Sequence, residues 1–404
     1  MKMNSLIIIF LLGLVLVYTG CSHEEAKERN NSDTLLKQVG SSKDSQGTVK
    51  KTIEVPPDLN NPEIIKLKKT IELNPNDTFA PINNELDPET SRKLDQAIYA
   101  ANMSINADPN SDAYNILGCI YDRKGEYDKA IDYYNKAIEL NPKHGYLYND
   151  AEIFNNRGVS YGKKGDYDQA IADLNKAIKL IPKFTKAYCN RGNVYSEKGE
   201  NDKAIADYNK AIQLDPKYDD AYCNRGSSYA EKGEYDKAIA DYSKVIKLNP
   251  KYGKAYYKRG VAYKNKEKYD EAIVNFNKAI ELNPKVADSY FSRGLTYNKK
   301  GQYDLAMADY NKAIELNPNF TEAYVGRGKN NSDNGDDNQA LADYNKAIEL
   351  NPNFSLAYNN RAVKYYFKGD YDNAWLDIEK CRQLGLQPNS EFFEKLRQAS
   401  GRND

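Results

Sequence analysis

Few residues in this 404-residue chain could carry out nucleophilic or metal chemistry, and they are scattered. The two histidines are His23 and His144. The five cysteines are Cys21, Cys119, Cys189, Cys223 and Cys381, and no two have the C-x-x-C spacing of zinc or haem sites. No glycine-rich phosphate-binding motif occurs, and any Ser-His-Asp or Cys-His set would have to use one of the two histidines. We therefore expect no catalytic activity, no metal and no cofactor.

The charge balance excludes another class of function. Lys+Arg and Asp+Glu both number 58, so the chain lacks the basic excess of nucleic-acid-binding proteins. A mean hydropathy of −0.82 is low enough to suggest disorder. However, the 34 tyrosines and many alanines recur at fixed intervals, which indicates an ordered fold.

The first 21 residues have the pattern of a secretion signal. Lys2 precedes an apolar run at residues 6–18, which is too short for a membrane-spanning helix of ~20 residues. The run ends in "VYTGC", which resembles the lipobox of bacterial lipoproteins, although Tyr18 stands where that family usually has leucine. The resemblance implies that Cys21 is lipidated with a palmitate-type chain. An uncleaved anchor and an ordinary signal peptide with an incidental cysteine stay open as alternatives.

Residues 22–61 are polar and charged, with almost no aromatic side chains. Such a segment cannot bury enough apolar surface to order itself. A coil of this length spans roughly 35 Å, so we expect a disordered tether between a membrane and a folded body.

The rest of the chain is dominated by a 34-residue repeat. Position 20 of the repeat is alanine in all eight copies, position 8 is glycine in the first seven, and position 32 is proline in the first seven. Repeats 1 to 8 occupy residues 111–144, 151–184, 185–218, 219–252, 253–286, 287–320, 321–354 and 355–388. A period of this length is typical of stacked supersecondary units.

The repeated residues predict a helix hairpin. Small residues at positions 8, 20 and 27 allow two helices to approach closely. Glycine at position 15, as in Gly199, can end the first helix, and we expect aspartate at position 18, as in Asp168, to cap the second. The proline at position 32 stops the second helix. One hairpin has too little core to stand alone, so the hairpins must stack.

This pattern resembles the tetratricopeptide repeat family over residues 111–388. The resemblance implies an all-α fold, a right-handed superhelical solenoid of stacked helix-turn-helix hairpins. Residues 62–110 are interpreted as a degenerate N-terminal repeat or cap, and residues 389–404 as a C-terminal capping helix. Six extra residues, 145–150, separate repeats 1 and 2; they form either an additional partner contact or an early start of the next helix.

On the first helix of each repeat, positions 2, 5, 9 and 12 share the side opposite to the packing face. Stacked through eight repeats, these positions would line the concave surface that solenoids use for partners. The residues that we expect in the peptide-binding groove are Lys186, Cys189, Asn193, Asp220, Cys223, Asn224, Ser227, Lys254, Tyr257 and Lys258.

Some family members hold an acidic C-terminal peptide with a carboxylate clamp. Asn193, Asn224, Lys254 and Lys258 match four of its five residues, but Cys189 stands where the leading lysine would be. A bound carboxylate would then lose one charge-assisted hydrogen bond, which counts against this ligand. Equivalent residues on neighbouring helices should be roughly 8–10 Å apart, too far for a disulfide between Cys189 and Cys223. The arginines at position 7 are expected to pair with aspartate at position 23 as structural ties between helices.

These observations predict a non-enzymatic scaffold that binds peptides or helices of other proteins and is tethered by Cys21 to the bacterial cell envelope. Ser22 favours the periplasmic face of the outer membrane. One alternative is a self-associating structural component of an envelope assembly. Another is a chaperone co-factor with a partial carboxylate clamp, which would require residues 1–21 to have no targeting role. The sequence does not give the partner or the oligomeric state.

Overall fold

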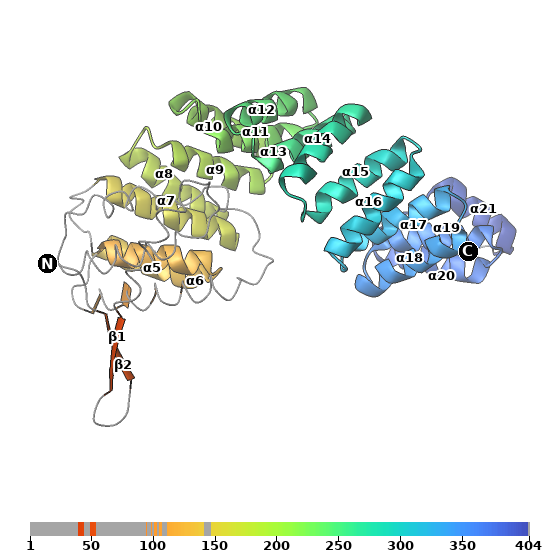
Figure 1. Cartoon of the computed structure of the whole chain (residues 1–404), viewed down its shortest axis with the longest axis horizontal. Coiled ribbons are helices and arrows are strands. Elements are labelled where there is room, and N and C mark those ends of the chain that lie inside the picture. Colours follow the sequence, from red (N-terminus) through yellow and green to blue (C-terminus); the bar gives the residue numbers. More distant parts are fainter. Residues whose placement is uncertain are drawn as a thin grey trace. The chain divides into compact units, whose positions relative to one another are not determined.

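The computed structural model describes residues 39–43, 49–53, 94, 98, 101, 102, 105, 106, 111–140 and 147–402. Within 111–140 and 147–402 every regular element is a helix, which confirms the expected all-α fold class (Figure 1). None of the described helices is long and apolar enough to cross a membrane. The predicted signal peptide with Cys21 lies outside the described residues.

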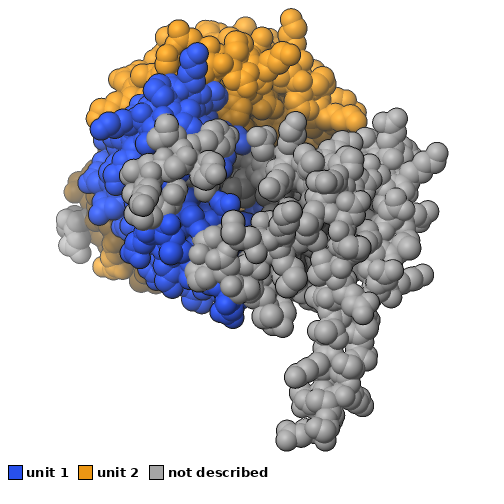
Figure 2. Space-filling view, turned by 90° about the vertical axis from the view of Figure 1, so that its left-hand side faces the viewer, with its two compact units in different colours: residues 1–200 blue, residues 201–404 orange. Residues whose placement is uncertain are grey.

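The chain divides into two compact units, residues 1–200 and 201–404, coloured blue and orange in Figure 2. The helices of the first are α5 (Ser111–Arg123), α6 (Tyr127–Glu139), α7 (Leu147–Lys164), α8 (Tyr167–Leu180) and α9 (Thr185–Glu197). Those of the second are α10 (Asn201–Leu214), α11 (Asp219–Glu231), α12 (Tyr235–Leu248), α13 (Gly253–Asn265), α14 (Tyr269–Leu282), α15 (Ala287–Lys299), α16 (Tyr303–Leu316), α17 (Thr321–Asp333), α18 (Asp337–Leu350), α19 (Ser355–Phe367), α20 (Tyr371–Gln383) and α21 (Ser390–Ser400).

The helices pack in consecutive pairs through the small residues of the repeat. The alanines at position 20 are fully buried, and the turn glycines at position 15 have positive φ, as at Gly199 with φ 76°. At Gly328 a Cβ atom would lie only 2.7 Å from Cε1 of Tyr344, so glycine is needed for the two helices of repeat 7 to touch. Repeat 5 departs from this rule, because Glu267 occupies the turn position with φ 58°.

Both ends of the repeat array have additional packing. Leu94 and Ile98 are helical and pack against Ile116 and Ile120 of α5. After repeat 8, Leu396 of α21 is fully buried among residues of α19 and α20. The helix α21 therefore covers part of the last hairpin.

Two findings concern the segments that depart from the repeat. The helix α7 begins at Leu147, so the extra residues between repeats 1 and 2 lengthen a helix at its start, as one of the two alternatives predicted. Inside the segment predicted as a disordered tether, the structure has an antiparallel pair of strands, β1 (Val39–Lys43) and β2 (Val49–Ile53), with Val39 opposite Ile53. These ten residues differ from the expected coil, and the β-branched Val39, Val49 and Ile53 favour extended backbone.

The arginine at position 7 ties three helices together. In repeat 6, Arg293 of α15 donates from Nε and Nη2 to the two carboxylate oxygens of Asp309 in α16, at 2.8 and 2.6 Å. Its Nη1 donates to Oδ1 of Asn277, in α14 of the preceding repeat, at 2.6 Å. Corresponding ties join Arg157 to Asp173 and Asn135, Arg225 to Asp241 and Asn209, Arg327 to Asp343 and Asn311, and Arg361 to Asp377 and Asn345. The expected structural pairing is confirmed, and each tie also reaches the previous repeat.

The aspartate at position 18 does not cap the second helix, contrary to the sequence-based expectation. In repeat 2 the N-cap of α8 is Asp166, at position 16, so Asp168 already lies inside the first helical turn. Asp168 accepts a hydrogen bond from Nζ of Lys198, at position 14 of the next repeat, at 2.8 Å. This hydrogen bond holds the pKa of Asp168 below its usual value. The aspartate that recurs at position 18 therefore forms a contact between neighbouring repeats.

Candidate functional site

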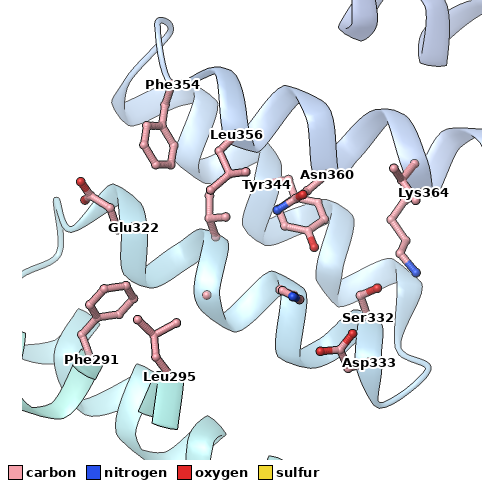
Figure 3. Close-up of a pocket in the computed structure, with 14 residues that line it drawn as sticks. Phe291, Leu295, Glu322, Ser332, Asp333, Tyr344, Phe354, Leu356, Asn360 and Lys364 are labelled. Carbon is pink, nitrogen blue, oxygen red and sulfur yellow. The ribbon is translucent and has the colours of Figure 1, made fainter. Parts of the chain in front are cut away.

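A pocket of about 480 Å³ lies between α15, α17 and α19, the first helices of repeats 6, 7 and 8 (Figure 3). Its lining comes largely from positions 2, 5, 9 and 12, the positions that the sequence analysis assigned to the partner-binding side. The lining residues are Phe291, Leu295, Glu322, Val325, Gly326, Lys329, Ser332, Asp333, Tyr344, Phe354, Leu356, Asn360, Val363 and Lys364.

One end of the pocket is apolar. Figure 3 shows that Leu356 of α19 points into the pocket, and that Phe291 and Leu295 of α15 line the same end. Leu356 is 46 % exposed, so a large part of its apolar side chain faces the pocket. Removal of apolar surface from water lowers the free energy of a complex. This end of the pocket therefore favours an apolar group of a partner.

The ring of Phe291 is held in place by its neighbours. Its centroid is 4.9 Å from that of Phe320, in a tilted arrangement typical of stabilising aromatic pairs. Gly326 leaves room for it, because a Cβ atom there would lie 3.2 Å from Cε2 of Phe291 and 2.9 Å from Cε1 of Tyr310. The apolar end is therefore a pre-formed surface.

The other end of the pocket is polar. Figure 3 shows Ser332 and Asp333 of α17 on this side, with the amino group of Lys364 directed toward them. Nζ of Lys364 is already bonded to Oδ1 of Asp337 at 2.7 Å, so its charge is compensated inside the protein. This end of the pocket therefore offers hydrogen-bonding groups to a ligand but no strong net charge.

Between the two ends lies the hydroxyl group of Tyr344. The side chain is only 2 % exposed, and its hydroxyl has no hydrogen-bond partner among the described residues. In repeat 4 the equivalent hydroxyl of Tyr242 bonds Oγ of Ser227 at 3.4 Å, whereas repeat 7 has Lys329 at the position of that serine. Burial raises the pKa of Tyr344, so its hydroxyl stays protonated and can donate a hydrogen bond to a ligand.

Sequence models of a known family match most of the repeat region. Models described as tetratricopeptide repeat match residues 111–144, 151–184, 253–286, 287–320, 321–354 and 343–375, and one described as TPR repeat matches 192–233 and 226–267. The chain belongs to the tetratricopeptide repeat family.

Solved structures agree with this family. A tetratricopeptide repeat protein from Parabacteroides merdae ATCC 43184 is 25 % identical, with a TM-score of 0.51, over 62 % of this chain and 99 % of that one. The APC/C hetero-tetramer Cut9-Hcn1 is 17 % identical, with a TM-score of 0.55, over 88 % of this chain and 62 % of that one, and shares the fold. The comparison with curated proteins gives no match.

Tetratricopeptide proteins are generally non-enzymatic scaffolds for protein–protein interaction, and this coarse function extends to the present chain. Its partners are accordingly other proteins. Among the described residues, no three side chains of His, Cys, Asp or Glu come together in a group that could hold a metal ion.

The groove residues named from the sequence lie in tetratricopeptide repeats 3 to 5 and have different environments. Cys189, Cys223 and Asp220 are buried, so their side chains are not presented to a partner in this structure. Lys254 is exposed. The half-buried members are Lys186, Asn193, Asn224, Ser227, Tyr257 and Lys258. Neither Cys189 nor Cys223 forms a disulfide, as expected.

The four residues that resemble a carboxylate clamp belong to different compact units. Asn193 lies in the first unit, whereas Asn224, Lys254 and Lys258 lie in the second. Nζ of Lys258 donates to Oγ of Ser227 at 2.6 Å, and burial lowers the pKa of Lys258. This lysine therefore has a partner inside the protein, which weakens it as a clamp for an external carboxylate.

The sequence analysis did not name the pocket of repeats 6 to 8. Most of its lining residues occupy the repeat positions predicted for the groove, but the prediction named residues of the central repeats. The signal that could have directed it was the apolar side chain at positions 5 and 9, where Phe291, Leu295 and Val363 replace the cysteines and polar residues of repeats 3 and 4.

Proposed function

We propose that the chain is a scaffold that binds a peptide or helix of a partner protein in the pocket of repeats 6 to 8. The observation that carries this proposal is an apolar pocket lined by the almost completely buried Tyr344, whose hydroxyl group has no hydrogen-bond partner among the described residues. Leu356 and Phe291 would contact an apolar side chain of the partner. The hydroxyl of Tyr344 would donate to a carbonyl oxygen next to that side chain. Pockets of this volume, mostly apolar with few polar groups, are typical of specific binding sites.

The surface around the pocket supports a polypeptide ligand. Glu322 and Lys329 are exposed residues of opposite charge on α17. The rim of the pocket therefore does not favour a ligand with a large charge of either sign. The pocket is continuous with the exposed side of three first helices, which solenoid proteins use for extended partners. The helix α21 covers part of the last hairpin, which disfavours the alternative of end-to-end self-association through that hairpin.

The test is a pair of matched substitutions at exposed leucines. Peptide ligands are first selected against the purified full chain by phage display. Leu356→Asp places a carboxylate in the apolar end and should weaken their binding by about tenfold or more, since ~1.5–3 kcal/mol of leucine contact is lost. Leu376→Asp is the control, because Leu376 is 64 % exposed on α20 and does not line the pocket.

Both substitutions should leave the helical circular dichroism of the chain unchanged, because neither side chain is buried in the core. Selected peptides should share an apolar anchor residue and bind the Leu376→Asp variant as tightly as the original chain. Peptides that bind the Leu356→Asp variant with undiminished affinity would contradict the proposal.

We propose that the protein is localised to the bacterial cell envelope, at the periplasmic face of the outer membrane, and is anchored there by a lipid on Cys21. The support is the sequence pattern of residues 1–21 and the polar segment after it. In this arrangement the pocket would hold a partner protein close to the membrane surface.

A further inference from the structure

Repeat 5 has the position-7 arginine but lacks its carboxylate partner. Nε of Arg259 donates to Oδ1 of Asn275 at 2.8 Å, and Nη1 donates to Oγ of Ser243 at 2.9 Å. Both acceptors are neutral. Nη2, which in repeats 2, 4, 6, 7 and 8 donates to the second carboxylate oxygen of an aspartate, has no acceptor here among the described residues. Among the described residues Arg259 therefore has no carboxylate partner, and its guanidinium carbon lies 5.6 Å from the centroid of the Tyr256 ring.

Arg259 lines an open pocket of about 350 Å³ on α13 and α14, whose labels are adjacent in Figure 1. Asn277 lines the same pocket; its Oδ1 accepts from Arg293 of the next repeat, so its amide N–H groups are available to a ligand. Lys278 is paired with Glu281 at 2.5 Å. The lining thus has two cations and one carboxylate, which favours a ligand with a single negative charge.

An aliphatic side chain stands beside this cation. Val274, at position 22 of repeat 5, is 67 % exposed and lines the pocket. Repeats 2, 3, 4, 6 and 7 have alanine at this position, so both the exposed valine and the neutral Asn275 are particular to repeat 5. The two departures place an apolar contact next to an unpaired guanidinium.

We infer that the pocket around Arg259 and Val274 is a second binding site of the chain, for a carboxylate carried by a polypeptide next to an aliphatic group. The guanidinium fork matches a carboxylate geometrically and forms charge-assisted hydrogen bonds with it. The ligand carboxylate accepts from Nη2, because Nε and Nη1 of Arg259 are already bonded to Asn275 and Ser243. This inference concerns other residues than the pocket of repeats 6 to 8 and does not rest on the function proposed for that pocket.

The first test uses 3-methylbutanoate, a minimal aliphatic carboxylate, and the full chain labelled with ¹⁵N-arginine. The Nε–H signal of Arg259, assigned with the Arg259→Lys variant, should shift in a saturable manner. The neutral isostere 3-methylbutanamide should leave the signal in place. An equal shift with the amide, or no shift with the carboxylate, overturns the inference.

Two variants give the matched controls. Asn275→Asp restores the carboxylate of the other repeats and should weaken carboxylate binding by about tenfold or more, because an internal charge-assisted bond then competes. Asp309→Asn removes the carboxylate from repeat 6 and should make the Arg293 signal responsive. Undiminished binding by the Asn275→Asp variant overturns the inference. This variant is expected to fold, because other repeats have aspartate at the same position.

A second set of titrations identifies the source of the carboxylate. A hexapeptide that ends in leucine with a free C-terminus represents a chain end, and its amidated form is the control. An amidated hexapeptide with an internal Leu-Asp pair represents a side chain. Binding of either acidic peptide supports the inference. Binding of inorganic phosphate with no response to either peptide overturns it, since the site would then be a general anion site.

Discussion

At the scale of the residue, the surroundings of the tyrosine at position 24 determine whether its hydroxyl group bonds inside the protein or is available to a ligand. Tyr242 and Tyr344 are both almost completely buried at position 24 of their repeats. The hydroxyl of Tyr242 bonds Ser227, whereas that of Tyr344 has no partner among the described residues and lines a pocket. The difference arises from position 9 of the facing helix, where repeat 7 has Lys329 in place of serine.

This comparison predicts the effect of Tyr344→Phe on ligand binding. Loss of the hydroxyl should weaken binding of the selected peptides by about 0.5–1.5 kcal/mol, the usual value of one hydrogen bond, as measured by isothermal titration calorimetry. The free energy of unfolding should not decrease, because no bond inside the protein is lost. Tyr242→Phe should leave binding unchanged. If Tyr344→Phe bound the peptides as tightly as the original chain, the hydroxyl would have no role in recognition.

At the scale of the element, the arginine ties explain why hairpins stack in a fixed register. Each guanidinium joins its own helix to the second helix of the same repeat and to that of the preceding repeat. The aspartate side chains in these ties are largely buried, as at Asp309. Removal of the arginine would leave that carboxylate without its counter-charge.

Repeat 5 provides an internal control for the contribution of these ties. Arg293→Ala should lower the free energy of unfolding by about 3 kcal/mol, the lower end of the range for one partner of a buried ion pair, since Arg293 is partly exposed. Arg259→Ala should cost clearly less, because Asn275 is neutral and tolerates burial without a counter-charge. Urea unfolding followed by circular dichroism measures both values. Equal losses would show that packing of the arginine stem, and not the charge pair, dominates.

The sequence determined the helix hairpins well, because glycine, proline and alanine act locally at the turns and contacts that they form. It was less successful where a residue acts across repeats. Asp168 has the residue type of a cap, but its partner Lys198 lies 30 residues away, so capping was the wrong prediction. The asparagine partners of the arginine ties were missed for the same reason. The pocket was missed because Gly326 and Phe291 shape it through contacts that spacing alone does not show.

At the scale of the whole molecule, the proposed tether decides where the binding sites operate. If Cys21 is the lipidated residue, metabolic labelling with palmitate should mark the full chain. Cys21→Ser should abolish the label, and the protein should move from the membrane fraction to the soluble fraction. The buried Cys189 is the matched control, and Cys189→Ser should leave labelling unchanged. Label that persists in the Cys21→Ser variant would remove the lipid anchor from the proposal.

The arginine ties also bear on how such a chain can change its length. Every tie of the common type uses residues at positions 7, 23 and 25, and the last of these comes from the preceding repeat. A 34-residue segment gained or lost by recombination between two such repeats would bring an arginine beside an asparagine of the same type. The new junction would need no further substitution, so the array can grow or shrink one hairpin at a time. The hexapeptide AYCNRG, at residues 187–192 and again at 221–226, is what a recent duplication of this kind would leave behind.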